Sequence, residues 1–150
     1  MIQRIQSIYL FLSGLSVLSL FLSFMPFGSA DPSQGNALPV ILRDGVYNLN
    51  DNIVLLILTI AAAVIAFVSI FIFKNRNLQM KIAALMMIIS LAILIIAYVI
   101  YYQQTKAIPN SSEHLGTGMI SPVLSILFGS LANRSIRKDE KLVKSMDRLR

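Results

Sequence analysis

The stretch that decides the fold is residues 53–73, which reads IVLLILTIAAAVIAFVSIFIF and contains no charged residue. The hydrocarbon core of a bilayer is about 30 Å thick, and an α-helix needs roughly 20 apolar residues to cross it. This stretch is therefore long and apolar enough to span a membrane. The polar residues Asn52 and Lys74 flank it and mark where the span ends.

The composition of the whole chain agrees with a membrane environment. Of 150 residues, 56% are hydrophobic and 13% are charged, whereas a soluble domain has about 25% charged residues. So few charges cannot cover the surface of a water-soluble globule of this size. The chain has no cysteine and one histidine, which excludes disulfides, thiolate metal sites and multi-histidine centres. We expect no cofactor.

Three further stretches predict spans, at residues 5–25, 82–102 and 115–132. The first two contain no charged residue, and none of the four stretches shows the alternation of a barrel strand. Because only helices and closed barrels satisfy the backbone in lipid, we predict an all-α fold. The chain is then a single domain, a four-helix transmembrane bundle that continues into a basic amphipathic C-terminal helix.

The stretch 115–132 is the least regular of the four, because Gly116, Gly118 and Pro122 interrupt it. Proline is tolerated in the first turn of a helix, and Ser121 just before it is a candidate cap. A re-entrant or kinked entry over residues 115–121 is the alternative.

The basic residues predict how the chain is threaded. Eleven of the 13 Lys and Arg residues lie in the N-terminal stub, in the turn at residues 74–81 and in the tail at residues 133–150. Only Arg43 and Lys106 lie on the other side. Because basic segments stay cytoplasmic, we predict that both termini are inside and that the loop at residues 26–52 is external.

Two segments around the external loop have competing interpretations. The small residues 28–30 allow a cleavable signal peptide, but the preceding apolar run is longer than the usual 7–15 residues, so we favour an uncleaved helix. Within the loop, Asp44-Gly45 between residues 40–43 and 46–49 indicates a β-hairpin. A connector with a local turn is favoured over a functional lid.

Aromatic residues gather where two spans would meet the external headgroups. Tyr98, Tyr101 and Tyr102 lie near the end of the third span, and Phe24 and Phe27 near the end of the first. Amphipathic rings prefer this interface, so a belt of membrane anchors is favoured over a quinone-binding cluster.

No ionisable residue lies inside the four predicted spans. Ionisable groups at that depth mark ion pathways and proton relays, so proton-pumping and redox roles are disfavoured. Glu113 beside His114 is the one candidate acid–base pair, and catalysis or metal binding would need further converging groups. We therefore expect no catalytic and no metal-binding residue, and predict that the protein is not an enzyme.

Small residues form stripes on the predicted helices, and the clearest stripe lies on the fourth span. Such residues let helices approach closely and form hydrogen bonds in lipid, so we predict a helix-packing role; a path for a polar substrate is the alternative. The stripe on the fourth span consists of Ser121, Ser125, Gly129 and Asn133.

The tail predicts a basic amphipathic helix. Ile136, Leu142 and Val143 fall on one face, which Asp139 interrupts, and the basic residues lie opposite. A helix of this kind next to a bilayer is typical of contact with anionic headgroups; simple positive-inside anchoring is the alternative, and nucleic acid is not an expected partner. The predicted headgroup-contacting residues are Arg134, Arg137, Lys138, Lys141, Lys144 and Arg148.

The two ends of the chain also carry a family resemblance. Residues 1–6, MIQRIQ, and residues 131–145, LANRSIRKDEKLVKS, with 147–150, DRLR, are similar to a bacterial family of four-span integral membrane proteins, domain of unknown function four-two-nine-three. The resemblance implies a bacterial inner-membrane location. It further implies a shared role for Arg4 and the tail, for instance a meeting of the two ends at the cytoplasmic face, and it brings no activity or cofactor.

The leading functional hypothesis is a non-enzymatic scaffold or accessory subunit that packs against a second copy or another membrane protein. A small transporter or channel for an uncharged or lipophilic solute is the alternative. An enzyme acting on lipids would need Glu113, His114 and an acid of the external loop to converge.

Overall fold

The computed structural model describes residues 3–22, 24–29, 42, 45–73, 75–106 and 114–147. The α-helices are α1 (Gln3–Leu18), α2 (Ile53–Phe71), α3 (Arg76–Lys106) and α4 (Ile120–Asp147). Three short strands, β1 (Gly28–Ser29), β2 (Val46–Tyr47) and β3 (His114–Leu115), and the 3-10 helices η1 (Ser19–Phe21), η4 (Leu49–Asp51) and η5 (Thr117–Met119) complete the described elements.

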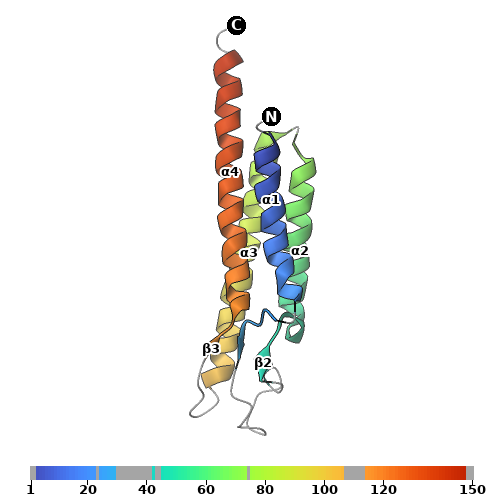
Figure 1. Cartoon of the computed structure of the whole chain (residues 1–150), viewed down its shortest axis with the longest axis vertical. Helices are drawn as coiled ribbons and strands as arrows, with labels where there is room; N and C mark the ends of the chain where they lie inside the picture. The colour runs from blue at the N-terminus through green and yellow to red at the C-terminus, as the bar shows by residue number, and fades with distance from the viewer. Residues whose placement is uncertain are drawn as a thin grey trace.

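The four α-helices form an elongated bundle, and the strands lie at one end of it (Figure 1). Around the bundle, α1 packs against α2 and α4, and α3 packs against the same two helices. Because α1 begins and α4 ends at the pole opposite the strands (Figure 1), we call that pole the terminal pole and the other the strand pole. The predicted all-α, four-helix fold class is confirmed.

Three stretches of the described chain are long and apolar enough to cross a membrane, namely α2, α3 and residues Thr117–Val143. The apolar helix at Ile5–Phe21 is shorter, at the lower limit of about 17 residues for a crossing. Asn52 starts α2 where the sequence predicts it, because its side-chain oxygen accepts from the backbone N–H groups of Val54 (2.9 Å) and Leu55 (3.4 Å).

The first helix ends earlier than the predicted span at residues 5–25. After η1 the backbone becomes extended at Leu22, and the residues that follow form part of the strand pole. There Pro26 O accepts from Gly118 N (2.8 Å), and Phe27 O accepts from Gly116 N (2.9 Å). Pro26 also disfavours helical dihedrals at Met25, the residue before it. Residues 25–27 therefore lie outside the helix.

The fourth helix also differs from its prediction. Leu115 lies in β3 and residues Thr117–Met119 form η5, so the regular helix begins only at Ile120. Pro122 then falls in the first turn, where its missing N–H costs little. At its other end α4 runs without a break to Asp147, so the fourth span continues into the predicted helical extension.

A small antiparallel sheet closes the strand pole, in the order β2-β1-β3. Gly28 pairs with Tyr47 on one side and with Leu115 on the other. The second arm of the predicted hairpin pairs with β1, since Val46 lies opposite Ser29, and the Leu42 carbonyl oxygen accepts from Gly45 N at 2.9 Å. The rest of the first arm lies outside the described residues.

Two predicted belt aromatics are buried inside this pole. The Tyr101 hydroxyl lies 3.0 Å from Ser29 O and 3.1 Å from His114 O and donates to this pair, which ties β1 and β3 to α3. Its ring fills the space where a side chain at position 28 would stand, which requires glycine there. Phe27 is fully buried against Tyr47, with ring centroids 5.6 Å apart. Tyr98, Tyr102 and Phe24 remain exposed, as a belt requires.

Tyr47 is a buried titratable group of this pole. Burial, with a further contribution from the nearby Asp51 carboxylate, raises the pKa of its phenol from 10.0 to about 12. The phenol oxygen has no hydrogen-bond partner among the described residues.

Below pH 10 the Tyr47 phenol is neutral in both the folded and the unfolded state. We predict that the free energy of unfolding falls as the pH rises from 10 to 12. The folded state holds the proton that the unfolded state releases, and the full loss amounts to about 3 kcal/mol. Tyr47→Phe should remove this loss and also stabilise the protein by about 1 kcal/mol at neutral pH, because a buried hydroxyl without a partner is deleted. Thermal unfolding in mild detergent across this pH range measures both effects. The exposed Tyr98→Phe serves as control, and equal alkaline sensitivity of Tyr47→Phe and the native chain would contradict the prediction.

Candidate functional site

The stripe on α4 meets hydroxyls of two other helices in the middle of the bundle. Ser125 Oγ lies 2.9 Å from Ser13 Oγ of α1 and 3.1 Å from Ser90 Oγ of α3. Ser13 Oγ is also 2.9 Å from the Ser125 carbonyl oxygen. All three side chains are fully buried, so these serines, which we call the serine node, bond three helices to one another.

The other members of the stripe lie along the same helical face. Ser121 is buried near the strand pole, and its Oγ lies 2.8 Å from Ser19 Oγ. Gly129 faces Met86 and Met87 of α3 so closely that an added Cβ would stand 2.8 Å from a carbon of each. Small side chains at these positions are therefore what allows α4 to approach α1 and α3.

Beyond the stripe, α4 contacts the first turns of α1 and α3 at the terminal pole. Gln6 Nε2 donates to Asp139 Oδ2, and a guanidinium nitrogen of Arg76 donates to the Asp139 carbonyl oxygen at 3.1 Å. We call these three residues the terminal clasp. It joins three helices, because Asp139 lies 133 positions from Gln6 and 63 positions from Arg76 in the sequence.

The burial of Asp139 corrects the sequence analysis, which placed this residue in a tail outside the bundle. Its side chain is only 6% exposed, and its Oδ1 has no hydrogen-bond partner among the described residues. The reason is that α1 begins at Gln3 and α3 at Arg76, so both helices extend alongside the part of α4 that was expected to stand alone. The break in the apolar face at Asp139 was the signal in the sequence.

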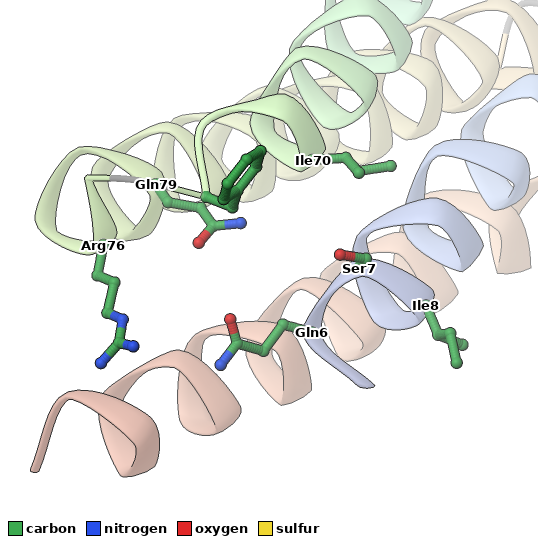
Figure 2. Close-up of a pocket in the computed structure, with 7 residues that line it drawn as sticks. Gln6, Ser7, Ile8, Ile70, Arg76 and Gln79 are labelled. Atoms are coloured by element: carbon green, nitrogen blue, oxygen red, sulfur yellow. The ribbon is translucent and has the colours of Figure 1, made fainter. Parts of the chain in front are cut away.

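A cavity of about 510 Å³ lies beside the terminal clasp, between the start of α1 and the turn from α2 to α3. Figure 2 shows the side chains of Gln6, Ser7, Arg76 and Gln79 directed toward one another around it. The Gln79 side chain is also fixed by α2, because its Nε2 donates to Ser69 O at 3.1 Å. The remaining lining residues are apolar, namely Ile8, Ile70 and Phe73.

The side chains of this cavity are suited to hydrogen bonding and offer little to catalysis. The cavity presents a guanidinium, two carboxamides and a hydroxyl, which donate and accept hydrogen bonds; none of these four groups is a strong base or an activated nucleophile at neutral pH. Its apolar wall suits the hydrocarbon part of an amphiphile. No pattern in the sequence singles out these residues, because isolated Gln and Ser residues at span ends are common.

The candidate acid–base pair gains no partner from the described residues. His114 lies in β3 with its side chain exposed, and Glu113 lies outside the described residues. The Asp51 carboxylate accepts from Asn48 N at 2.6 Å, as part of the turn that precedes α2. Within the described chain, no group of three His, Cys, Asp or Glu side chains is arranged to hold a metal ion.

Five of the six basic residues predicted to contact headgroups lie in the last part of α4, and Arg148 follows it. Arg134, Arg137, Lys138 and Lys141 are exposed. The side chain of Lys144 and the whole of Arg148 lie outside the described residues.

Asn133, the last residue of the stripe, has its side-chain oxygen buried with no hydrogen-bond partner among the described residues.

Comparison with known proteins places the chain in a family. The model of a family described as a domain of unknown function, DUF4293, matches residues 2–149, so the chain belongs to that family. No curated protein and no solved structure matches it.

We predict that Ser125→Ala lowers the free energy of unfolding by about 1 kcal/mol, because hydrogen bonds between helices in membrane proteins are individually modest. Ser130→Ala is the matched control, since the Ser130 hydroxyl bonds only to Leu127 O of its own helix at 2.8 Å. Thermal unfolding in mild detergent distinguishes them. Equal stability of the two variants would show that the serine node contributes nothing to helix packing.

The terminal clasp predicts a larger effect. Gln6→Leu removes the side-chain donor to the buried Asp139 carboxylate and should cost about 2–3 kcal/mol. The double variant Gln6→Leu with Asp139→Leu should recover most of this loss, because no buried carboxylate is then left without a donor. The same unfolding assay measures both, with the exposed Gln103→Leu as control. A double variant less stable than Gln6→Leu alone would contradict this explanation.

Proposed function

We propose that this family member is a non-enzymatic accessory subunit or scaffold of the bacterial inner membrane, with both termini in the cytoplasm. The observation that carries the proposal is the continuous helix α4, which starts inside the bundle and ends beyond it (Figure 1). The projecting part, residues 140–147, is then the segment that meets a second copy or another membrane protein.

The length of α4 supports this position. It contains 28 residues, so at 1.5 Å per residue it is about 42 Å long, against a hydrocarbon core of about 30 Å. Its last turns therefore extend past the lipid. Within them Leu142 is 45% and Val143 is 39% exposed, and apolar side chains exposed next to a polar face favour a surface that meets lipid headgroups or a partner.

The charge distribution supports the orientation. The terminal pole holds Arg76 and Lys81 at the start of α3 and the exposed basic residues near the end of α4. Lys106, at the end of α3, lies toward the other pole. Since basic residues remain on the cytoplasmic side, the terminal pole faces the cytoplasm and the small sheet faces outward.

The packing of the bundle disfavours the alternative, a small transporter or channel. A polar path would have to be lined by the serine stripes, yet Ser13, Ser90 and Ser125 bond to one another and are fully buried. The arrangement fits a rigid membrane anchor better than a conduit. An enzymatic role gains no support from the described residues, among which His114 is exposed and no three His, Cys, Asp or Glu side chains are grouped.

Site-specific photo-crosslinking in native membranes tests the proposal. We predict that a photoreactive residue at position 142 or 143 gives discrete protein adducts larger than the monomer, identifiable by mass spectrometry as a second copy or another membrane protein. The same residue at position 88, where Ile88 is 64% exposed on α3, is the control for random collisions in the bilayer. Adducts to lipid alone at positions 142 and 143, together with a lone monomer after gentle solubilisation, would overturn the proposal that the protein is a scaffold or accessory subunit.

A further inference from the structure

A second cavity, of about 400 Å³, lies between the start of α3 and the part of α4 that begins with the last residue of the stripe. From α3 it is lined by Asn77, Met80, Lys81 and Ala84, and from α4 by Asn133 and Arg137. It thus joins a residue predicted for helix packing, Asn133, with one predicted for headgroup contact, Arg137.

The charge of this cavity is one-sided. Lys81 and Arg137 approach it from two different helices, and no Asp or Glu is among its lining residues. Two cations facing one hollow create a positive potential that attracts an anion. The cavity beside the terminal clasp differs, because there the single cation, Arg76, contacts a residue that bears a carboxylate.

An unsatisfied acceptor lies at the same place. The side-chain oxygen of Asn133 is buried and has no hydrogen-bond partner among the described residues. A buried acceptor without a donor is costly, and if the Asn133 side chain rotated toward the cavity, a ligand hydroxyl group would remove that cost. The ligand that fits is therefore an anion that also carries a hydrogen-bond donor.

The depth of the cavity identifies the class of anion. Lys81 directly precedes the uncharged residues 82–102, and Asn133 directly follows the apolar stretch at residues 115–132. The cavity consequently lies where the apolar part of the bundle ends, which is the level of the lipid headgroups. Met80 and Ala84 give it an apolar wall, and basic pockets between helices on the cytoplasmic side suit anionic headgroups.

We propose that this cavity binds the phosphate group of an anionic glycerophospholipid whose headgroup carries a free hydroxyl. Lys81 and Arg137 hold the phosphate, and the Asn133 side chain rotates toward the cavity so that its oxygen accepts a hydrogen bond from the headgroup hydroxyl. The assignment of the lipid leaflet rests on the orientation under the proposed function, whereas the phosphate site rests on the cavity itself.

Native mass spectrometry of the full chain in mild detergent tests this site with phosphatidylglycerol and phosphatidylcholine as probes. We predict that the native chain retains one phosphatidylglycerol in preference to phosphatidylcholine. The double variant Lys81→Gln with Arg137→Gln should bind phosphatidylglycerol about thirtyfold more weakly, since each cation near an anionic lipid contributes a few-fold to affinity. The charge-preserving pair Lys81→Arg with Arg137→Lys should retain it, which shows that a loss does not come from misfolding.

The matched comparison is Arg134→Gln with Lys138→Gln, which removes two exposed charges of α4 that are predicted to contact headgroups but do not line the cavity. Retention by this control and loss by the cavity variant support the proposal. Equal loss in both pairs would overturn it, because the tail then attracts lipid only by its net charge. Binding that is unchanged in the cavity variant would overturn it as well.

A third arm separates a lipid from a soluble ligand. If glycerol phosphate displaces phosphatidylglycerol at equal concentration, the phosphate site stands and its ligand is soluble, so the lipid assignment is overturned. No displacement supports the lipid. Because this assay needs neither a bilayer nor a partner protein, its outcome is independent of the crosslinking test of the scaffold.

Discussion

The constraint on which the structure depends is that polar groups buried away from water must find partners within the protein. The helices satisfy their own backbone, but the hydroxyls of α1, α3 and α4 need one another. Ser13, Ser90 and Ser125 lie within 3.1 Å of a partner and are fully buried. Gly129 allows the close approach that these bonds require. A bundle without a strong hydrophobic force between its helices is thereby held in one arrangement.

The same constraint explains the strand pole. Where the chain leaves the helices, residues 26–29 would expose a row of backbone donors and acceptors near the membrane surface. They are satisfied because β1 lies between β2 and β3, and because the Tyr101 hydroxyl donates to carbonyls of both β1 and β3. The close contact of Tyr101 with Gly28 shows that the pole is packed as tightly as a helix interface. It ties the connection between α1 and α2 to the connection between α3 and α4.

The sequence was sufficient to predict the helices and insufficient to predict how their ends meet. Uncharged stretches such as residues 53–73 specify a helix through length and composition alone, and the start of α2 at Ile53 follows from the Asn52 cap. The sheet was not predictable, because pairing of Val46 with Ser29 depends on contacts between segments far apart in the chain. The burial of Tyr101 and Phe27 follows from that sheet, and this is why they do not join the exposed belt of Tyr98 and Tyr102. The cavities, likewise, depend on how far α1 and α3 extend beside α4.

Asp139 shows how such an extension changes the meaning of a residue. By helical periodicity it is a flaw in the apolar face of a basic tail. In the bundle it is the point where α1 and α3 hold α4, through the Gln6 side chain and the Arg76 guanidinium. A carboxylate buried with one donor and one unsatisfied oxygen is a poor way to gain stability, since an apolar pair of similar volume would serve as well or better. Its presence is better explained by position: it fixes the register at which α4 leaves the bundle, and with it the direction of the projecting segment on which the proposed scaffold depends.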